Sequence, residues 1–110
     1  MAEREQQPLE IRSFEIDARN SGHFQVHGVD TNLLYDVLSG EPLFFVNPPA
    51  DNRSGTHLMI GPASDGRFWT IVIVMTHEPG VWRPITGWPS TTKEMTTWRE
   101  ETFPRPRNET

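Results

Sequence analysis

The 110 residues of this chain are enough for one hydrophobic core and too few for two, so we expect a single domain. No apolar run approaches the roughly 20 residues that a membrane-spanning helix needs, and the absence of cysteine excludes disulfides and thiolate metal sites. The formal net charge of -5 argues against a broad basic surface that would hold nucleic acid by counterion release.

Both ends of the chain are polar and offer little to bury. We expect residues 1–9 to form a disordered lead and residues 103–110 a flexible tail, which leaves one folded domain over residues 10–102. The lead contains no apolar segment of the kind that a secretory signal requires, so we expect a cytoplasmic protein.

The first elements are predicted from apolar residues and capping residues. Alternating apolar side chains predict a short strand within residues 11–16. Asp17 is a suitable N-cap and Gly28 a suitable C-cap for a helix over residues 18–27. The sequence therefore predicts a strand followed by a helix at the start of the domain.

A second helix is predicted directly afterwards. Either Asp30 or Thr31 can cap its start, and Gly40 is placed to end it. Its apolar residues recur at the spacing of one buried helix face, namely Leu33, Leu34, Val37 and Leu38. The apolar run at residues 43–46, bounded by prolines and Asn47, predicts a strand after this helix.

Residues 67–75 form the most apolar stretch of the chain. Both of its alternating faces are mostly apolar, with Phe68, Thr70, Val72 and Val74 on one and Trp69, Ile71, Ile73 and Met75 on the other. This pattern indicates a strand that is covered on two sides. A strand at residues 56–61 precedes it, and the turn residues 64–66 between them contain Asp-Gly, which predicts an antiparallel hairpin.

A further strand is predicted at residues 81–86, followed by a turn at residues 87–90. Pro84 lies inside this strand and cannot donate a hydrogen bond to a neighbouring strand. We therefore expect the strand to lie at an edge of the sheet or to be bulged at Pro84.

The last predicted element is a helix that ends near residue 101. Thr91 followed three residues later by Glu94 forms a capping-box pattern at its start. The order of predicted elements describes an α+β domain in which helices pack on a mostly antiparallel sheet of four to five strands.

Short motifs along this chain resemble the BrnT family of small toxins, which belongs to the RelE/ParE superfamily of bacterial type II toxin–antitoxin systems. The likeness extends from about Phe14 to Trp98. It is carried by Phe14, Asp17, Asn20, the triplet His27, Gly28 and Val29, the helix end Tyr35, Asp36, Val37 and Leu38, then Gly61, Gly66, Arg67, Arg83, Ile85, Thr86, Glu94 and Trp98. Together, the order and spacing of these residues are moderately specific for this family.

The resemblance implies a RelE-like sheet with two N-terminal helices and one C-terminal helix, ribonuclease activity without a metal or other cofactor, and a cognate antitoxin that covers the active surface. RNA is the second partner that it implies, no membrane partner is expected, and a homodimer is left open. Trp88 and Pro89 stand where the family carries basic residues. A non-catalytic member of the same fold, serving as a protein-interaction module, is therefore the alternative.

Arginines are the candidates for holding the scissile phosphate, because guanidinium groups suit phosphate geometry. Arg67 begins the long apolar strand and Arg83 lies on the next strand, so both side chains are candidates for one side of the sheet. Arg53, in the loop before the hairpin, is a candidate third cation. For each arginine the alternative is a surface residue or the partner of a carboxylate.

Histidines are the candidates for acid–base assistance in such a reaction. His57 is favoured because its strand adjoins the long apolar strand, and His27 is the second choice. His23 and His27 also have the spacing of two metal ligands on one helix face, but no third ligand is evident. No metal site is predicted.

Glu94 and two tryptophans have both structural and functional interpretations. Glu94 is either the capping partner of Thr91 or a general base, and the capping role is favoured. Trp82 and Trp88 lie near Arg83, where they either stack on a base of RNA or fill a core or an interface. Packing in a core or an interface is the favoured interpretation for both tryptophans.

Overall fold

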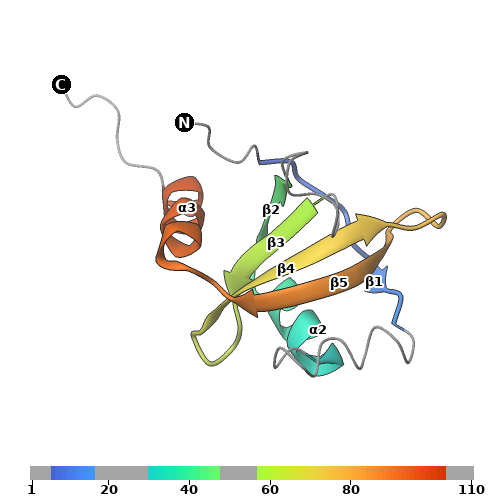
Figure 1. Cartoon of the computed structure of the whole chain (residues 1–110), viewed down its shortest axis with the longest axis horizontal. Helices are drawn as coiled ribbons and strands as arrows, with labels where there is room; N and C mark the ends of the chain where they lie inside the picture. Colours follow the sequence, from blue (N-terminus) through green and yellow to red (C-terminus); the bar gives the residue numbers. More distant parts are fainter. Residues whose placement is uncertain (1–5, 17–29, 48–56, 104–110) are drawn as a thin grey trace.

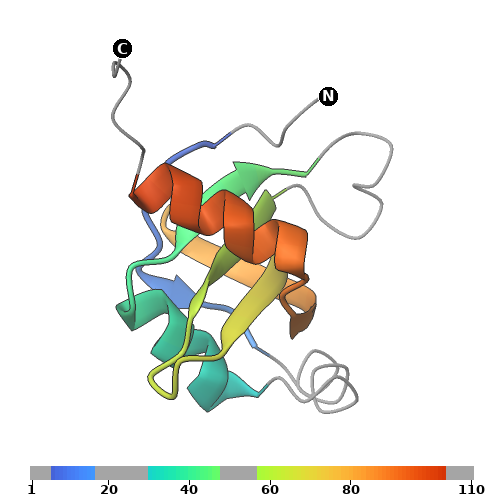
Figure 2. The same cartoon turned by 90° about the vertical axis from the view of Figure 1, so that its left-hand side faces the viewer.

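The computed structural model describes residues 6–16, 30–47 and 57–103. Within them a five-stranded sheet lies between two helices (Figures 1 and 2). In chain order the elements are β1 (Ser13–Phe14), α2 (Thr31–Ser39), β2 (Leu43–Val46), β3 (His57–Pro62), β4 (Phe68–Met75), β5 (Val81–Pro89) and α3 (Thr92–Thr102). The predicted α+β class is confirmed, and the helix predicted over residues 18–27 lies outside the described residues.

The strands lie in the order β1-β5-β4-β3-β2, which places β4 in the middle of the sheet. The three pairs among β2, β3, β4 and β5 are antiparallel, as predicted. β1 differs, because it pairs with β5 in parallel and makes the sheet mixed. A parallel pair needs a long connection, and here the whole chain between β1 and β5 provides it.

β4 is buried on both faces, as its sequence predicts. One face contributes Trp69, Ile71 and Ile73 to a core that includes Leu34 and Val37 of α2. The other face contributes Val72, and at its margin Phe68, to a second core that contains Trp98 of α3. The two helices therefore cover opposite sides of the sheet (Figure 2).

The ends of α2 match the predicted caps. The Asp30 side chain accepts a hydrogen bond from the backbone N–H of Leu33 at 2.9 Å, and the Gly40 N–H donates to the Val37 carbonyl at 3.0 Å. Leu34 and Val37 are fully buried on the face toward the sheet. The apolar periodicity thus correctly located this helix and its buried face.

Two polar side chains of α2 join it to distant parts of the chain. The Tyr35 hydroxyl accepts a hydrogen bond from the Phe14 N–H of β1 at 2.9 Å. The Asp36 carboxylate accepts from the backbone N–H and the hydroxyl of Ser64, in the loop between β3 and β4, at 3.0 and 2.9 Å. Both contacts fix the position of α2 on the sheet.

β5 extends through Pro89, so the turn predicted at residues 87–90 is wrong. Trp88 pairs with Thr70 and Pro89 with Trp69, which continues the ladder to the far end of β4. The predicted irregularity at Pro84 is confirmed: Pro84 pairs with Ile73 and Thr86 with Val72, so that Ile85 is the extra residue of a bulge.

Pro84 also affects the outer side of β5. The Trp82 carbonyl accepts from the Glu15 N–H on the β1 side. Backbone groups of alternate residues point in the same direction along a strand, so Pro84 also presents its backbone on that side. Because proline lacks an N–H, this part of β5 is a poor template for an added strand.

The opposite edge of the sheet is covered by residues that the sequence assigned to the disordered lead. Gln6 forms a bridge with Phe45 of β2, and the Gln7 N–H donates to the Phe44 carbonyl at 2.8 Å. Leu9 packs against the core on the α2 side. Residues 6–9 therefore belong to the fold, because they satisfy backbone groups along β2.

α3 begins with the predicted capping box. The Glu94 N–H donates to the Thr91 hydroxyl at 3.1 Å, and the Glu94 carboxylate accepts from the Thr91 N–H at 2.8 Å. Further along α3, the Trp98 ring contacts Phe68 edge to face at a centroid distance of 5.0 Å. Neither described helix is long and apolar enough to span a membrane.

The Trp98→Ala substitution is expected to lower the free energy of unfolding by about 3–5 kcal/mol, because it empties the centre of the α3-side core. Glu101→Ala is the control, since Glu101 is exposed on the same helix, and we expect a loss within about 0.5 kcal/mol. Urea denaturation measures both. Equal losses would contradict the assignment of Trp98 as the anchor of α3.

Candidate functional site

The two candidate phosphate-binding arginines lie at opposite ends of β4. Arg67 directly precedes β4, whereas Arg83 pairs with Val74 near the end of that strand. The seven-residue step from position 67 to position 74 corresponds to roughly 23 Å at ~3.3 Å per residue. The structure therefore does not bring Arg67 and Arg83 together on one site.

Each of these arginines also has a carboxylate nearby. The Arg67 side chain is 79% exposed and lies 3.9 Å from the Asp65 carboxylate, within its own turn. Arg83 forms an ion pair with Glu15 at 3.3 Å, and both side chains are partly exposed. These positions fit the alternatives weighed from the sequence, which are a surface arginine and a carboxylate partner.

His57 lies at the start of β3, on the same face as the buried Met59. Its ring contacts Trp82 edge to face at a centroid distance of 5.3 Å, and its Nε2 is hydrogen-bonded to the Gln7 side chain. Burial lowers the pKa of His57 below its ordinary value of 6.5. Burial therefore favours the neutral form of the ring, which is packed by residues of the fold.

Three other residues that the sequence analysis considered lie in segments that the structure does not describe. Arg53, His23 and His27 lie outside the described residues, so their predicted roles stay predictions. Among the described residues, no group of three or more metal-binding side chains lies together. Of the predicted catalytic residues, His57, Arg67 and Arg83 are thus the ones that can be compared with the structure.

Glu94 is a buried carboxylate at the junction of α3 and the sheet. In addition to the Thr91 N–H, it accepts hydrogen bonds from the Thr70 hydroxyl at 2.8 Å and from the Trp88 indole N–H at 3.2 Å. The Thr70 hydroxyl also contacts Ser90 at 2.8 Å. Donors from β4, from β5 and from the N-cap residue of α3 surround the carboxylate, which supports the capping interpretation.

Trp88 and Trp82 have structural surroundings as well. Trp88 packs against the α3-side core while its indole N–H is held by Glu94. Trp82 is buried in the α2-side core. The favoured interpretation of these tryptophans as packing residues agrees with both positions, and the large face that base stacking needs is covered on Trp82.

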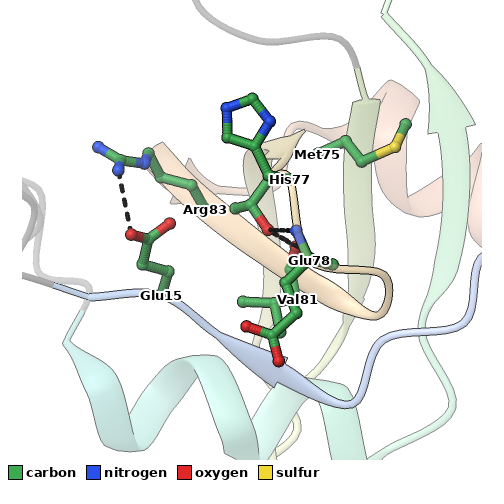
Figure 3. Close-up of a pocket in the computed structure, with 7 residues that line it drawn as sticks. Glu15, Met75, His77, Glu78, Val81 and Arg83 are labelled. Atoms are coloured by element: carbon green, nitrogen blue, oxygen red, sulfur yellow. Dashed lines mark hydrogen bonds and ion pairs between the residues drawn. The ribbon is translucent and has the colours of Figure 1, made fainter.

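A cavity of about 640 Å³ lies beside the turn that connects β4 and β5 (Figure 3). Its walls come from the residue after β1, from the end of β4, from the turn and from the start of β5, and they consist of Glu15, Met75, Thr76, His77, Glu78, Val81 and Arg83. Figure 3 shows Arg83 and Glu15 turned toward each other. Two carboxylates and one guanidinium thus share the walls with the apolar Met75 and Val81.

The turn beside this cavity is held by its own hydrogen bonds. The Thr76 hydroxyl donates to the Val81 carbonyl at 2.6 Å and accepts from the Glu78 N–H at 3.2 Å. Gly80 has a φ of 83°, and a Cβ there would collide with Arg12, whose guanidinium donates to the Pro79 carbonyl at 2.6 Å. The backbone of this turn is therefore preorganised.

Sequence reasoning did not foresee this cavity. The ion pair between Glu15 and Arg83 depends on the parallel pairing of β1 with β5, which no local pattern predicts. The exposed Met75 was the available signal, because it ends an apolar strand directly before a polar turn. Comparison of the chain with models of protein families, with curated proteins and with solved structures finds no match.

Glu94→Ala is expected to lower the free energy of unfolding by about 2–3 kcal/mol, because it leaves the Thr91, Thr70 and Trp88 donors without their shared acceptor. The matched control is Glu100→Ala on the exposed face of α3, for which a change within about 0.5 kcal/mol is expected. Chemical denaturation measures both variants. A stable Glu94→Ala variant would contradict the structural role.

The lowered pKa of His57 predicts a pH dependence of stability. The unfolded chain takes up a proton as the pH falls through 6.5, before the folded chain does, so the contribution of His57 is present above pH 6.5 and is lost below it. The His57→Gln substitution should remove this loss of stability at low pH. Denaturation curves at several pH values measure the effect, and identical pH profiles for both proteins would contradict it.

Proposed function

We propose that this chain is a toxin-family protein of a type II toxin–antitoxin system that works as a protein-binding module and does not cleave RNA through Arg67 and Arg83. The observation that carries the proposal is the separation of these two arginines by the length of β4. A phosphoryl transition state needs cations that converge on one phosphate. Two arginines whose backbone positions lie roughly 23 Å apart along the strand do not meet this requirement.

The charges near each arginine support the same proposal. Glu15 partly neutralises Arg83, and Asp65 lies beside Arg67. The chain as a whole carries a formal charge of -5, which opposes the approach of a polyanion such as RNA. Glu78, which lines the cavity together with Arg83, adds a further negative charge near that arginine.

The family part of the proposal is supported by the motif order and by the arrangement of the elements. Those motif residues that the structure describes lie on β1, α2, the hairpin, β5 and α3, and the helices cover both faces of one sheet. A RelE-like fold is the finer description that we propose for this arrangement. The partner implied by such a family is a small cognate antitoxin.

The proposal is tested by two measurements on the purified full chain. Incubated with mixed RNA and a chelator, the protein should give no more cleavage than a buffer control, and the Arg67→Ala, Arg83→Ala double variant should behave identically. Mixed with the small protein encoded beside its gene, the chain should form a stable complex in size-exclusion chromatography with light scattering.

Each measurement has an outcome that would overturn its part of the proposal. Cleavage of RNA that disappears in the double variant would establish a ribonuclease that uses these arginines. A chain that remains uncomplexed with the neighbouring protein, while folded by circular dichroism, would remove the toxin–antitoxin assignment. Light scattering also shows whether the chain alone forms a homodimer.

A further inference from the structure

Residues 6–12 form a strap that runs from one edge of the sheet to the other (Figure 1). At one end Gln6 bridges to Phe45 of β2, and at the other the Arg12 N–H donates to the Gly80 carbonyl, directly before β5, at 2.7 Å. β2 is an edge strand, and β5 lies three positions away from it in the sheet. The strap therefore passes the start of β3 and the end of β4 on its way.

The span of the strap requires a nearly extended chain. Three inter-strand spacings of roughly 4.8 Å separate β2 from β5, which gives about 14 Å. The chain from residue 7 to residue 12 reaches at most about 17 Å. Pro8 favours this conformation, because its ring fixes its own φ and biases Gln7 toward extended backbone.

The apolar side chains of the strap lie toward the core. Leu9 and Ile11, two positions apart, both pack against the core on the α2 side, whereas the residues on either side of them are polar or exposed. An extended chain with one covered side gives this alternation. The Gln7 side chain adds a hydrogen bond with Nε2 of His57. The surface beneath the strap thus accepts two apolar side chains and one polar contact.

The strap is held less firmly than the strands that it passes. Five of its seven residues are exposed, and its two apolar side chains are only partly buried. Fixing the backbone costs entropy for every residue, and so few contacts offset this cost only narrowly. Segments of this kind open locally while the rest of a protein stays folded. We therefore expect the strap to open without unfolding of the sheet.

We propose that the strap is detachable and that the surface beneath it binds an extended segment of a partner protein. The partner segment carries two apolar side chains two positions apart, in the places of Leu9 and Ile11, and pairs its backbone with the edge of β2. The strap demonstrates the fit, because it makes these contacts within the chain itself. The inference rests on the proposed role as a protein-binding module and adds the surface that the partner uses.

The direct test supplies the strap as a separate peptide and needs no partner. A peptide with the sequence of residues 6–13 is titrated into the full-length wild type and into the double variant Leu9→Ser, Ile11→Ser. The strap of the wild type competes with the peptide, so the double variant should bind it at least about 10-fold more tightly. The ring signals of His57 report binding by NMR, and the exposed His77 is the internal control.

Two matched controls accompany this titration. A peptide of the same composition, in which residues 8 and 9 and residues 10 and 11 exchange places, should bind neither protein. The Glu10→Ser variant changes only the exposed side of the strap, so it should bind the original peptide as weakly as the wild type does.

Three results of the titration would overturn the inference. The first is equal binding of the two peptides to the double variant. The second is equal affinity of the wild type and the double variant for the original peptide. The third is loss of folding in the double variant by circular dichroism, because the strap would then be an indispensable part of the core.

Light scattering distinguishes a partner protein from a second copy of this chain. Both the wild type and the double variant should show the same oligomeric state as their concentration rises. A dimer that forms only in the wild type would overturn the proposed class of partner, because exchange of straps between two copies would then explain it.

The protein encoded beside this gene separates the inference from the proposed function. A partner that uses this surface should bind the double variant more tightly than the wild type, because it no longer has to displace the strap. Equal affinity for both would overturn the inference, although the proposed function stands. If the peptide binds the double variant but the neighbouring protein does not associate, the binding surface stands and the toxin–antitoxin assignment fails.

Discussion

Burial of β4 on both faces is the constraint on which the rest of the structure depends. A strand with two apolar faces needs a covering layer on each side, and the chain provides α2 on one side and α3 on the other. Almost every side chain in the middle of the sheet is thereby committed to packing. Groups that are free to bind a ligand are found instead at the strand ends and turns, where the cavity near Met75 and Arg83 lies.

Local patterns predicted the elements well, because each of them rests on contacts between residues close in sequence. The caps of α2, the Asp65–Gly66 turn and the Thr91–Glu94 capping box all belong to this kind. Long-range contacts were not predictable in the same way. The parallel pairing of β1 and the return of residues 6–7 along β2 involve segments that no local pattern connects.

The separation of Arg67 and Arg83 lies between these two kinds, because it follows from a local hairpin but depends on the pairing of two whole strands. The β4–β5 connection is a hairpin, so residues at equal distances from its turn lie opposite each other. Arg83 follows the turn closely and must face the end of β4, whereas Arg67 precedes the start of that strand. The register of this one hairpin therefore places Arg67 and Arg83 at opposite ends of β4, and the same register brings Arg83 to the edge where Glu15 can reach it.

Residues that carry a family likeness need not carry a reaction. Glu94 is buried among donors from two strands and from the N-cap residue of α3, and it holds α3 on the sheet. Gly61 lies so close to Pro42 that a Cβ would come within 2.8 Å of its backbone, and Gly66 has a φ of 90° in the hairpin turn. Each of these motif positions is explained by packing or backbone geometry. A likeness built from them supports a shared fold before it supports a shared activity, and the chemistry of this chain must be sought where its side chains remain exposed.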